Sequence, residues 1–167
     1  RDFCLSRGLG DVYKRQRITA LDVPCTEDEK CLTFETAHVT LKLFKKPFHF
    51  EMYDKEGKLL YQDLRERAFE KDQIGRLTHF SKVDREYDHF FGFGEKTGHL
   101  DKKGRRLRMS PKDAIGHDPE TGDPMYKHIP FYIRVNEKDR RPIGLFYHNS
   151  YDCVFDLGEE LSGYWER

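Results

Sequence analysis

Hydrophobic and polar residues alternate with a period of two along much of this chain, which is the pattern of β-strands with one buried face. The clearest run covers residues 33–43. Leu41 and Leu43 fall on one face of this run, and Phe34 and Lys42 fall on the other. The alternation predicts a single half-buried strand here.

Further alternating runs follow, separated by residues that favour turns. Residues 48–53 form the next run, and residues 54–57, Asp-Lys-Glu-Gly, are typical of a turn before the apolar residues 59–61. This order predicts a strand, a turn and a second strand. Residues 63–72 carry many helix-tolerant charges but little periodicity, so a short helix and a polar connection both stay open.

Three short runs in the second half of the chain are rich in aromatic and β-branched residues. They cover residues 129–135, 143–148 and 153–157. Such runs are typical of strands, and their spacing predicts that they are neighbours in one sheet. Because no long amphipathic helix and no internal repeat is found, the pattern as a whole predicts an all-β sandwich.

The composition narrows the class of protein. The chain has 167 residues, a length that suits one domain. Aromatic residues make up 14%, which is too many for a disordered chain. With 30 Lys+Arg against 30 Asp+Glu the formal charge is zero, which argues against general binding to polyanions such as nucleic acid. No run of 18 apolar residues occurs, so the sequence predicts no membrane-spanning helix.

The four cysteines are Cys4, Cys25, Cys31 and Cys153. Their spacing matches no zinc or redox motif, so a structural disulfide and reduced thiols are the two interpretations. The N-terminus has no apolar signal-peptide core, and we therefore expect reduced thiols in a cytoplasmic protein.

The first sixteen residues differ from the rest of the chain. Residues 1–16 show no sustained periodicity, and they resemble translated sequencing-adapter read-through, especially at residues 10–16. We treat 1–16 as a non-native or disordered leader and 17–167 as the domain. A genuine N-terminal strand at residues 10–13 is the alternative.

Residues 91–109 are rich in glycine and basic residues. The Gly-Phe-Gly of residues 92–94 lacks the third glycine of a dinucleotide loop, since Thr97 stands there, so strand glycines at a bulge or close approach are the preferred interpretation. Six Lys or Arg residues lie within residues 96–108 without an aromatic residue among them. A solvated hairpin around residues 101–104 is favoured over a nucleic-acid patch, which uses aromatic stacking as well.

Residues 110–124 form a long, turn-rich segment. It contains three carboxylates, Asp113, Asp118 and Asp123, together with His117. Such groups suit a hydrolytic or metal site, but their spacing matches no calcium loop, and Asp before Pro or Gly commonly caps a turn. Loops of this length without their own secondary structure are often functional.

Several blocks of sequence occur in an order that is more specific than any one of them. The blocks are FGFGEKTG at residues 91–98, GRR at 104–106, KDA at 112–114, DPE at 118–120 and PMYKHIPFYI at 124–133. In this order they resemble the N-terminal domain of glycoside hydrolase family 31, especially that of bacterial α-glucosidases. The resemblance extends over residues 36–165, most of the chain.

The resemblance implies an antiparallel, galactose-mutarotase-like β-sandwich, incomplete at its C-terminal end, standing before a (β/α)8 barrel. The family cleaves α-glucosidic bonds with retention through two barrel aspartates, and carboxyls about 5 Å apart are what a covalent glycosyl intermediate needs. A barrel takes about 250 residues, so both aspartates lie outside this chain. The chain is thus expected to be non-catalytic, with no cofactor and no metal.

Asp113 matches a family aspartate on a sandwich loop that hydrogen-bonds the sugar hydroxyls of the substrate. A carboxylate suits this role because it accepts charge-assisted hydrogen bonds from two neighbouring hydroxyls. Lys112 holds the adjoining position, where some members carry Arg, and Pro111 departs from the commoner family pattern. The resemblance places Glu95 and Tyr126 as supports of the sandwich or of its interface with the barrel.

Three hypotheses about function follow. The first is the N-terminal sandwich of an α-glucosidase that acts on short oligosaccharides, with the enzyme's own barrel as partner. The second is a stand-alone carbohydrate-binding module that uses Asp113, His117 and an aromatic platform such as Tyr126 or Trp165. The third is a nucleic-acid-binding domain that uses Lys102 to Arg108, which a steep salt dependence of binding would reveal. The sequence leaves linkage specificity and oligomeric state open.

Overall fold

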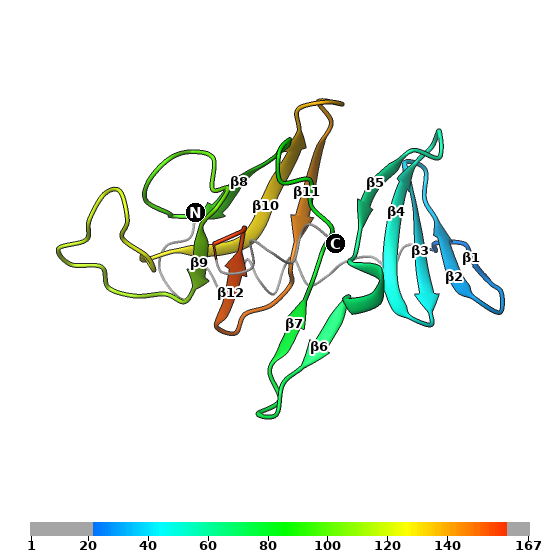
Figure 1. Cartoon of the computed structure of the whole chain (residues 1–167), viewed down its shortest axis with the longest axis horizontal. Coiled ribbons are helices and arrows are strands. Elements are labelled where there is room, and N and C mark those ends of the chain that lie inside the picture. Colours follow the sequence, from blue (N-terminus) through cyan, green and yellow to red (C-terminus); the bar gives the residue numbers. More distant parts are fainter. Residues whose placement is uncertain (1–21, 160–167) are drawn as a thin grey trace. The chain divides into compact units, whose positions relative to one another are not determined.

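A computed structural model describes residues 22–159, and the regular secondary structure of these residues is almost entirely β-strand (Figure 1). Their only helical segment is a three-residue 3-10 helix, so the predicted all-β class is confirmed. No helix within residues 22–159 is long and apolar enough to span a membrane. The leader at residues 1–16 and Trp165 lie outside the described residues. The chain divides into two compact units, Arg1–Phe69 and Glu70–Arg167.

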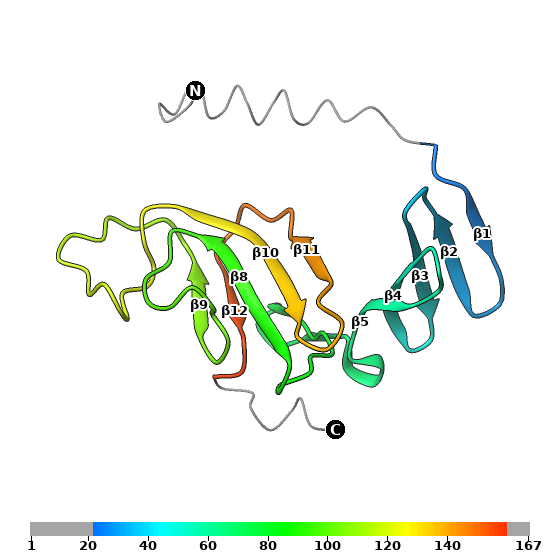
Figure 2. The ribbon, with the colours of Figure 1, turned by 90° about the horizontal axis from the view of Figure 1, so that it is seen from above.

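The first unit is an antiparallel meander in which each strand pairs with the next one in sequence (Figure 2). Its elements are β1 (Cys25–Glu27), β2 (Cys31–Glu35), β3 (Val39–Lys45), β4 (Phe48–Asp54), β5 (Leu59–Gln62) and η1 (Arg65–Arg67). The predicted strand, turn, strand over residues 48–61 is confirmed as β4 and β5. Residues 63–72, for which the sequence leaves two interpretations open, hold the short helix η1 and then a strand.

The prediction of one continuous strand over residues 33–43 is wrong, because the chain turns back between β2 and β3. The Thr36 hydroxyl accepts a hydrogen bond from the Val39 amide at 2.9 Å and donates one to the Val39 carbonyl at 2.8 Å. A threonine hydroxyl that bonds the backbone three residues further along the chain stabilises a tight turn. Phe34 is consequently paired with Leu41, on the apolar face of the sheet.

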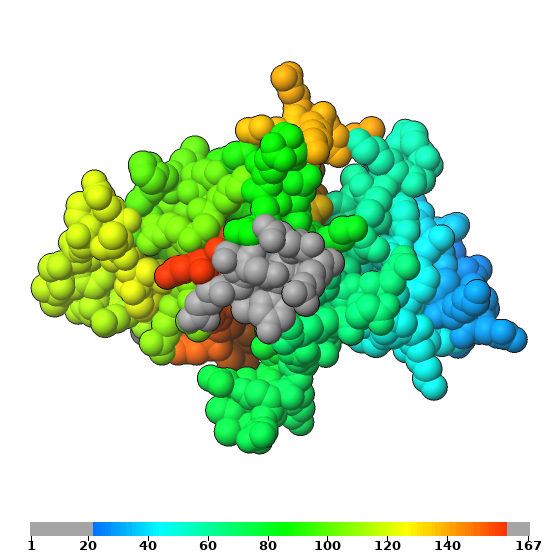
Figure 3. Space-filling model, in the orientation of Figure 1, coloured from blue at the N-terminus to red at the C-terminus, as the bar shows by residue number. Residues whose placement is uncertain are grey.

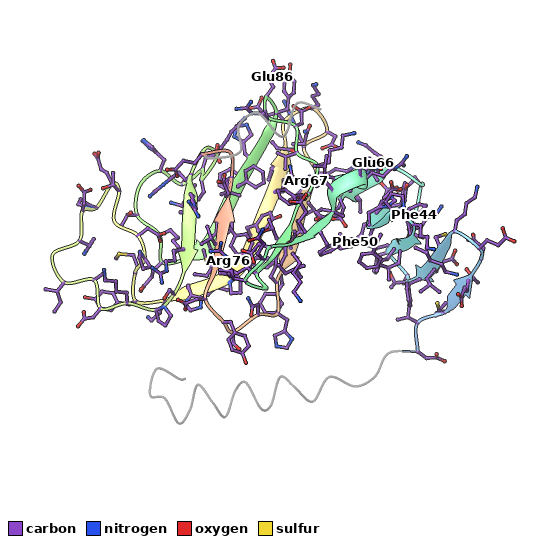
Figure 4. All side chains as sticks on the ribbon, turned by 60° about the horizontal axis from the view of Figure 1, so that its bottom comes forward. Phe44, Phe50, Glu66, Arg67, Arg76 and Glu86 are labelled. Atoms are coloured by element: carbon purple, nitrogen blue, oxygen red, sulfur yellow. The ribbon has the colours of Figure 1, made fainter. Side chains whose placement is uncertain are left out.

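One face of the meander is closed by an aromatic and carboxylate cluster. The Phe50 ring, labelled in Figure 4, lies 5.4 Å from the Tyr61 ring and 6.4 Å from the Phe69 ring, centre to centre. Asp63 is fully buried, and its carboxylate accepts hydrogen bonds from the Tyr61 hydroxyl at 3.0 Å and the Phe50 amide at 2.9 Å. A buried carboxyl group of this kind is tolerated because its oxygens are hydrogen-bonded.

The second unit contains a three-stranded sheet and two strand pairs. Its strands are β6 (Phe69–Lys71, which begins at the last residue of the first unit), β7 (Leu77–His79), β8 (Asp88–Gly94), β9 (Arg106–Met109), β10 (His128–Asn136), β11 (Pro142–Phe146) and β12 (Cys153–Asp156). The three-stranded sheet has the order β11-β10-β8, and the pairs are β12-β9 and β6-β7. The ladders of β10 and of the β12-β9 pair are antiparallel.

The β9-β12 pair packs on the inner face of the three-stranded sheet, which makes this unit a two-layered sandwich. Its fully buried residues include Leu107 and Met109 from β9 and Phe93 from β8. The Phe93 ring stacks on Tyr132 of β10, with the centroids 5.1 Å apart, and Phe155 of β12 packs against both rings. Side chains from all four strands therefore form one core.

Residues 129–135, 143–148 and 153–157 are predicted to be neighbouring strands of one sheet, and this prediction is wrong for residues 153–157. β12 pairs with β9 through four residue pairs, whereas β10 and β11 pair with each other as predicted. The strand at β9 is a finding that sequence analysis missed, because it is only four residues long and lies in a basic segment.

The glycines of β8 permit a close approach between two backbones. A Cβ atom on Gly92 would lie 2.8 Å from the Phe131 carbonyl oxygen, and one on Gly94 would lie 2.8 Å from the Ile129 nitrogen. The ladder between β8 and β10 is irregular at this point. The interpretation of these residues as strand glycines at a close approach is confirmed.

We expect Leu107→Ala to lower the free energy of unfolding by about 2–5 kcal/mol, because it deletes a fully buried side chain at the centre of the sandwich. Urea unfolding followed by circular dichroism measures this change. Leu100→Ala is the matched control, since Leu100 is 78% exposed, and its effect should stay within about 0.5 kcal/mol. Equal losses in the two variants would contradict the packing described above.

Candidate functional site

The long segment between β9 and β10, residues 110–127, is called the β9–β10 loop here. It extends away from the strands of the second unit (Figures 1 and 2), and it forms a projecting part of the surface in Figure 3. Lys112 and Asp113 are exposed on it, whereas Ala114 is buried. The two residues that the sequence nominates for sugar contact therefore lie on an accessible protrusion.

Asp113 is connected with the other end of the same loop. The Asp113 carboxylate lies near the Tyr126 hydroxyl, and partial burial together with this carboxylate raises the pKa of Tyr126. The Lys112 amide donates to the Met125 carbonyl at 3.2 Å. These contacts hold the beginning and the end of the loop side by side, with Asp113 at the accessible surface.

The other two carboxylates of the loop have structural partners. Asp118 accepts hydrogen bonds from the amides of Glu120 at 2.7 Å and Thr121 at 3.0 Å, and these bonds lower the pKa of Asp118. Asp123 points inward and accepts a hydrogen bond from the Lys96 ammonium at 2.5 Å. Asp118 is thus the turn cap that its sequence context indicates.

The hypothesis of a hydrolytic or metal cluster in this loop finds no geometric support. His117 is exposed, and its amide bonds the Ala114 carbonyl. Within residues 22–159, no three His, Cys, Asp or Glu side chains gather as metal ligands would.

Three basic side chains of the segment 96–108 point into the domain. The Lys102 ammonium donates to the carbonyls of His99 at 2.5 Å and Thr97 at 3.0 Å, and burial lowers the pKa of Lys102. The Arg105 guanidinium donates to the Thr97 carbonyl at 2.6 Å, and the Lys96 side chain is 1% exposed. The expectation of a solvated hairpin is wrong for Lys102. Its ammonium group is buried and donates hydrogen bonds to backbone carbonyls that lie outside the strands.

A depression of about 420 Å³ lies beside the β9-β12 pair. It is lined by Arg106, Arg108, Asp123, Asp152, Cys153 and Val154. The Arg108 guanidinium lies 3.2 Å from the Asp152 carboxylate, so charges of both signs meet at its wall. Neither Lys112 nor Asp113 lines it, and this depression is therefore separate from the predicted sugar contact.

A histidine bridge holds the base of the basic segment. His89 Nδ1 lies 2.6 Å from Asp101 Oδ2, and His89 Nε2 lies 2.9 Å from Glu137 Oε1. The hydrogen bond with Asp101 is the main reason that the pKa of His89 is raised. Burial acts to raise the pKa of Asp101, but hydrogen bonds from the Phe90 amide, His89 and the Lys103 amide outweigh it and lower that pKa.

The described cysteines contain no disulfide. Cys25, Cys31 and Cys153 are free thiols, exposed, buried and partly buried respectively. Cys4 lies outside the described residues. Burial raises the pKa of Cys153, which makes its thiolate less available.

With the fold and the loop established, the class of the protein follows from comparison with known proteins. The sequence model described as "Glycosyl hydrolase 31 N-terminal galactose mutarotase-like domain" matches residues 9–156. The chain therefore belongs to the N-terminal β-sandwich domains of glycoside hydrolase family 31.

Two curated relatives are similar in sequence. Alpha-glucosidase 2 of Bacillus thermoamyloliquefaciens is 37% identical over 154 residues, which are 92% of this chain and 19% of that protein. An alpha-glucosidase of Saccharolobus solfataricus is 38% identical over 73 residues, which are 44% of this chain and 10% of that protein. The chain thus spans at most about a fifth of the relatives that it matches.

Solved structures show a similar fold. The GH31 dextranase of Flavobacterium johnsoniae, complexed with glucose, aligns with a TM-score of 0.69 and 30% identity over 83% of this chain and 16% of its own. A GH31 α-xylosidase from a soil metagenome, complexed with xylose, aligns with a TM-score of 0.58 over 83% of this chain and 22% of its own. Its 14% identity shows the fold alone.

The contacts that sequence reasoning missed are those that hold the loop. The end of the β9–β10 loop is held by two side chains of the preceding segment: Lys96 bonds Asp123, and Thr97 bonds the Gly122 carbonyl. The signal in the sequence was present but ambiguous, because a basic glycine-rich segment is typical of several functions. The pairing of Lys96 with Asp123 spans 27 residues, and short-range patterns do not reveal such a contact.

The bridge at His89 predicts a pH-dependent stability. The raised pKa of His89 means that its stabilisation is complete below the unfolded value of about 6.5 and is lost as the pH rises through the folded pKa. The free energy of unfolding should therefore fall above about pH 6.5, and His89→Gln should flatten this part of the profile. Urea titrations from pH 5.5 to 9 measure it. An unchanged pH profile in the variant would refute the bridge.

Proposed function

We propose that this chain is the non-catalytic N-terminal β-sandwich of a retaining α-glucosidase and that its β9–β10 loop supplies a substrate contact to a barrel active site. The observation that supports this role most directly is that Asp113 is exposed on a loop of a domain from glycoside hydrolase family 31. The enzyme would hydrolyse α-glucosidic bonds in short oligosaccharides. Its barrel would contribute both catalytic aspartates. Because two carboxylates are sufficient for this hydrolysis, we expect no cofactor.

The chemistry of the loop supports this role. An exposed carboxylate accepts charge-assisted hydrogen bonds from two adjacent sugar hydroxyls. The Tyr126 side chain lies near the Asp113 carboxylate on the same loop. The neighbouring Lys112 provides a cation at the exposed surface, suited to donate to a hydroxyl oxygen. A sugar that approaches the loop would meet an acceptor and a donor side by side.

The choice of substrate would depend on residues outside this chain. Relatives with the same domain are described as alpha-glucosidases, a dextranase and an α-xylosidase, so one sandwich accompanies several specificities. We also propose a cytoplasmic location, since the free thiols of Cys25, Cys31 and Cys153 suit a reducing compartment.

The first experiment is to sequence the source DNA beyond residue 167 and to assay this chain alone. We expect the frame to continue into a barrel and the chain by itself to show no hydrolysis of α-glucosides. A stop codon directly after Arg167 would overturn the proposal, and so would hydrolysis by pure chain that Asp113→Ala abolishes. Sugar binding by the isolated chain in titration calorimetry would favour the alternative of a stand-alone carbohydrate-binding module.

In the complete enzyme, we expect Asp113→Ala to reduce kcat/KM for an α-linked disaccharide about 10- to 100-fold. This range corresponds to the loss of hydrogen bonds to a charged group, worth about 1.5–3 kcal/mol. Steady-state kinetics measures the change. Asp118→Ala is the matched control, because Asp118 caps a turn of the same loop, and it should change kcat/KM much less. An Asp113→Ala enzyme with wild-type kinetics would refute the contact.

A further inference from the structure

A deeply buried ion pair at the β9–β10 loop joins Lys96 to Asp123. The Lys96 side chain is 1% exposed and that of Asp123 is 11% exposed, and Lys96 Nζ lies 2.5 Å from Asp123 Oδ1. A buried pair is retained at a cost in desolvation unless further hydrogen bonds complete it. Both partners here have such bonds.

The additional bonds fasten the pair to β9. The Lys96 ammonium donates to the Arg108 carbonyl at 2.5 Å, and the Arg108 amide donates to Asp123 Oδ2 at 2.5 Å. Asp123 thus binds the Lys96 side chain with one carboxylate oxygen and the backbone of β9 with the other. The end of the loop is fixed to both.

Residues 97 and 98 add two bonds to the same part of the loop. The Thr97 hydroxyl donates to the Gly122 carbonyl at 2.6 Å, and the Gly98 amide donates to the Pro119 carbonyl at 3.0 Å. These bonds matter because Ala114 is the single buried apolar side chain among residues 110–127. Polar contacts, rather than hydrophobic burial, hold the loop in place.

The path from this clamp to Asp113 is short. Asp123 is followed two residues later by Met125, whose carbonyl accepts the Lys112 amide. Tyr126, the next residue, lies near the Asp113 carboxylate. A shift of Asp123 would therefore move both groups that orient Asp113.

We propose that Lys96 and Asp123 are positioning residues that set the place of Asp113 for its sugar contact. This inference rests on the function proposed above. Lys96 and Asp123 would affect substrate binding through Asp113, without contacting the substrate themselves. Small displacements of a binding group weaken hydrogen bonds steeply, so loss of the clamp reduces substrate binding.

The test is a double-mutant cycle in the complete enzyme. Lys96→Met and Asp123→Asn should each lower kcat/KM about 5- to 50-fold, mainly through KM. In the Asp113→Ala background the same substitutions should change kcat/KM by no more than about 2-fold, because the group that they position is already gone. A purely structural role would give the same loss in both backgrounds, and that result would overturn the inference.

Two further variants keep the test decisive. Thr97→Val removes a single hydrogen bond to the loop at nearly constant volume, so it replaces Lys96→Met if that variant does not fold. Lys127→Met is the matched control, since it removes an exposed ion pair between the same two segments, with Lys127 and Glu95 3.7 Å apart. We expect less than a 2-fold change from it, as is usual for exposed pairs.

Hydrogen exchange of this chain separates the possible failures. Lys96→Met and Thr97→Val should speed exchange in residues 112–126 while β8 and β10 stay protected. Unchanged exchange and unchanged kinetics in both, with Asp113→Ala impaired, would overturn the positioning role alone. Wild-type kinetics of Asp113→Ala would overturn the proposed function and, with it, this inference.

Discussion

The second unit depends on one constraint: backbone carbonyls outside the sheets must find hydrogen-bond donors. Residues 96–99 lie between strands, and the carbonyls of Lys96, Thr97 and His99 accept hydrogen bonds from the side chains of Lys102 and Arg105 rather than from a neighbouring strand. The Lys96 ammonium does the same for a carbonyl of β9. An unpaired buried carbonyl costs free energy comparable to a lost hydrogen bond, so these cations are part of the fold.

This arrangement explains why a strongly basic stretch need not be a binding surface. Its charges are divided between inward groups that complete the backbone and outward groups that pair with acids, such as Arg108 with Asp152. The rigid sandwich beneath them then carries an irregular loop on which polar groups remain accessible. Functional contacts are commonly found on loops that a rigid scaffold positions in this way.

The all-β class and several strands could be predicted from alternation alone, since β4, β5, β10 and β11 each show a clear period of two or a compact aromatic run. The turn at Thr36 could not, because a side-chain hydrogen bond reverses the chain where the hydrophobic pattern continues without interruption. The strands β1, β6, β7 and β9 were missed because three or four residues give too short a pattern.

The candidate site was predictable only in part. The family resemblance identified Asp113 through the blocks around it, and the structure shows this residue exposed, while its sugar contact stays a prediction. The inward orientation of Asp123 had no sequence signal, since Asp118 and Asp123 look alike before a proline and only the fold gives one of them a buried lysine as partner. Long-range electrostatic contacts of this kind depend on which strands pair, and local sequence does not specify that.

The edge strand β1 affects how the protein behaves in concentrated solution. Within the described residues it pairs with β2 alone, and its three residues are exposed. Glu27 at its end is bound by the Lys45 ammonium at 2.6 Å. An unpaired edge is a template for strands of other molecules, but a short edge that carries a charge is a poor one. This side of the meander therefore resists intermolecular β-sheet growth, the first step of aggregation.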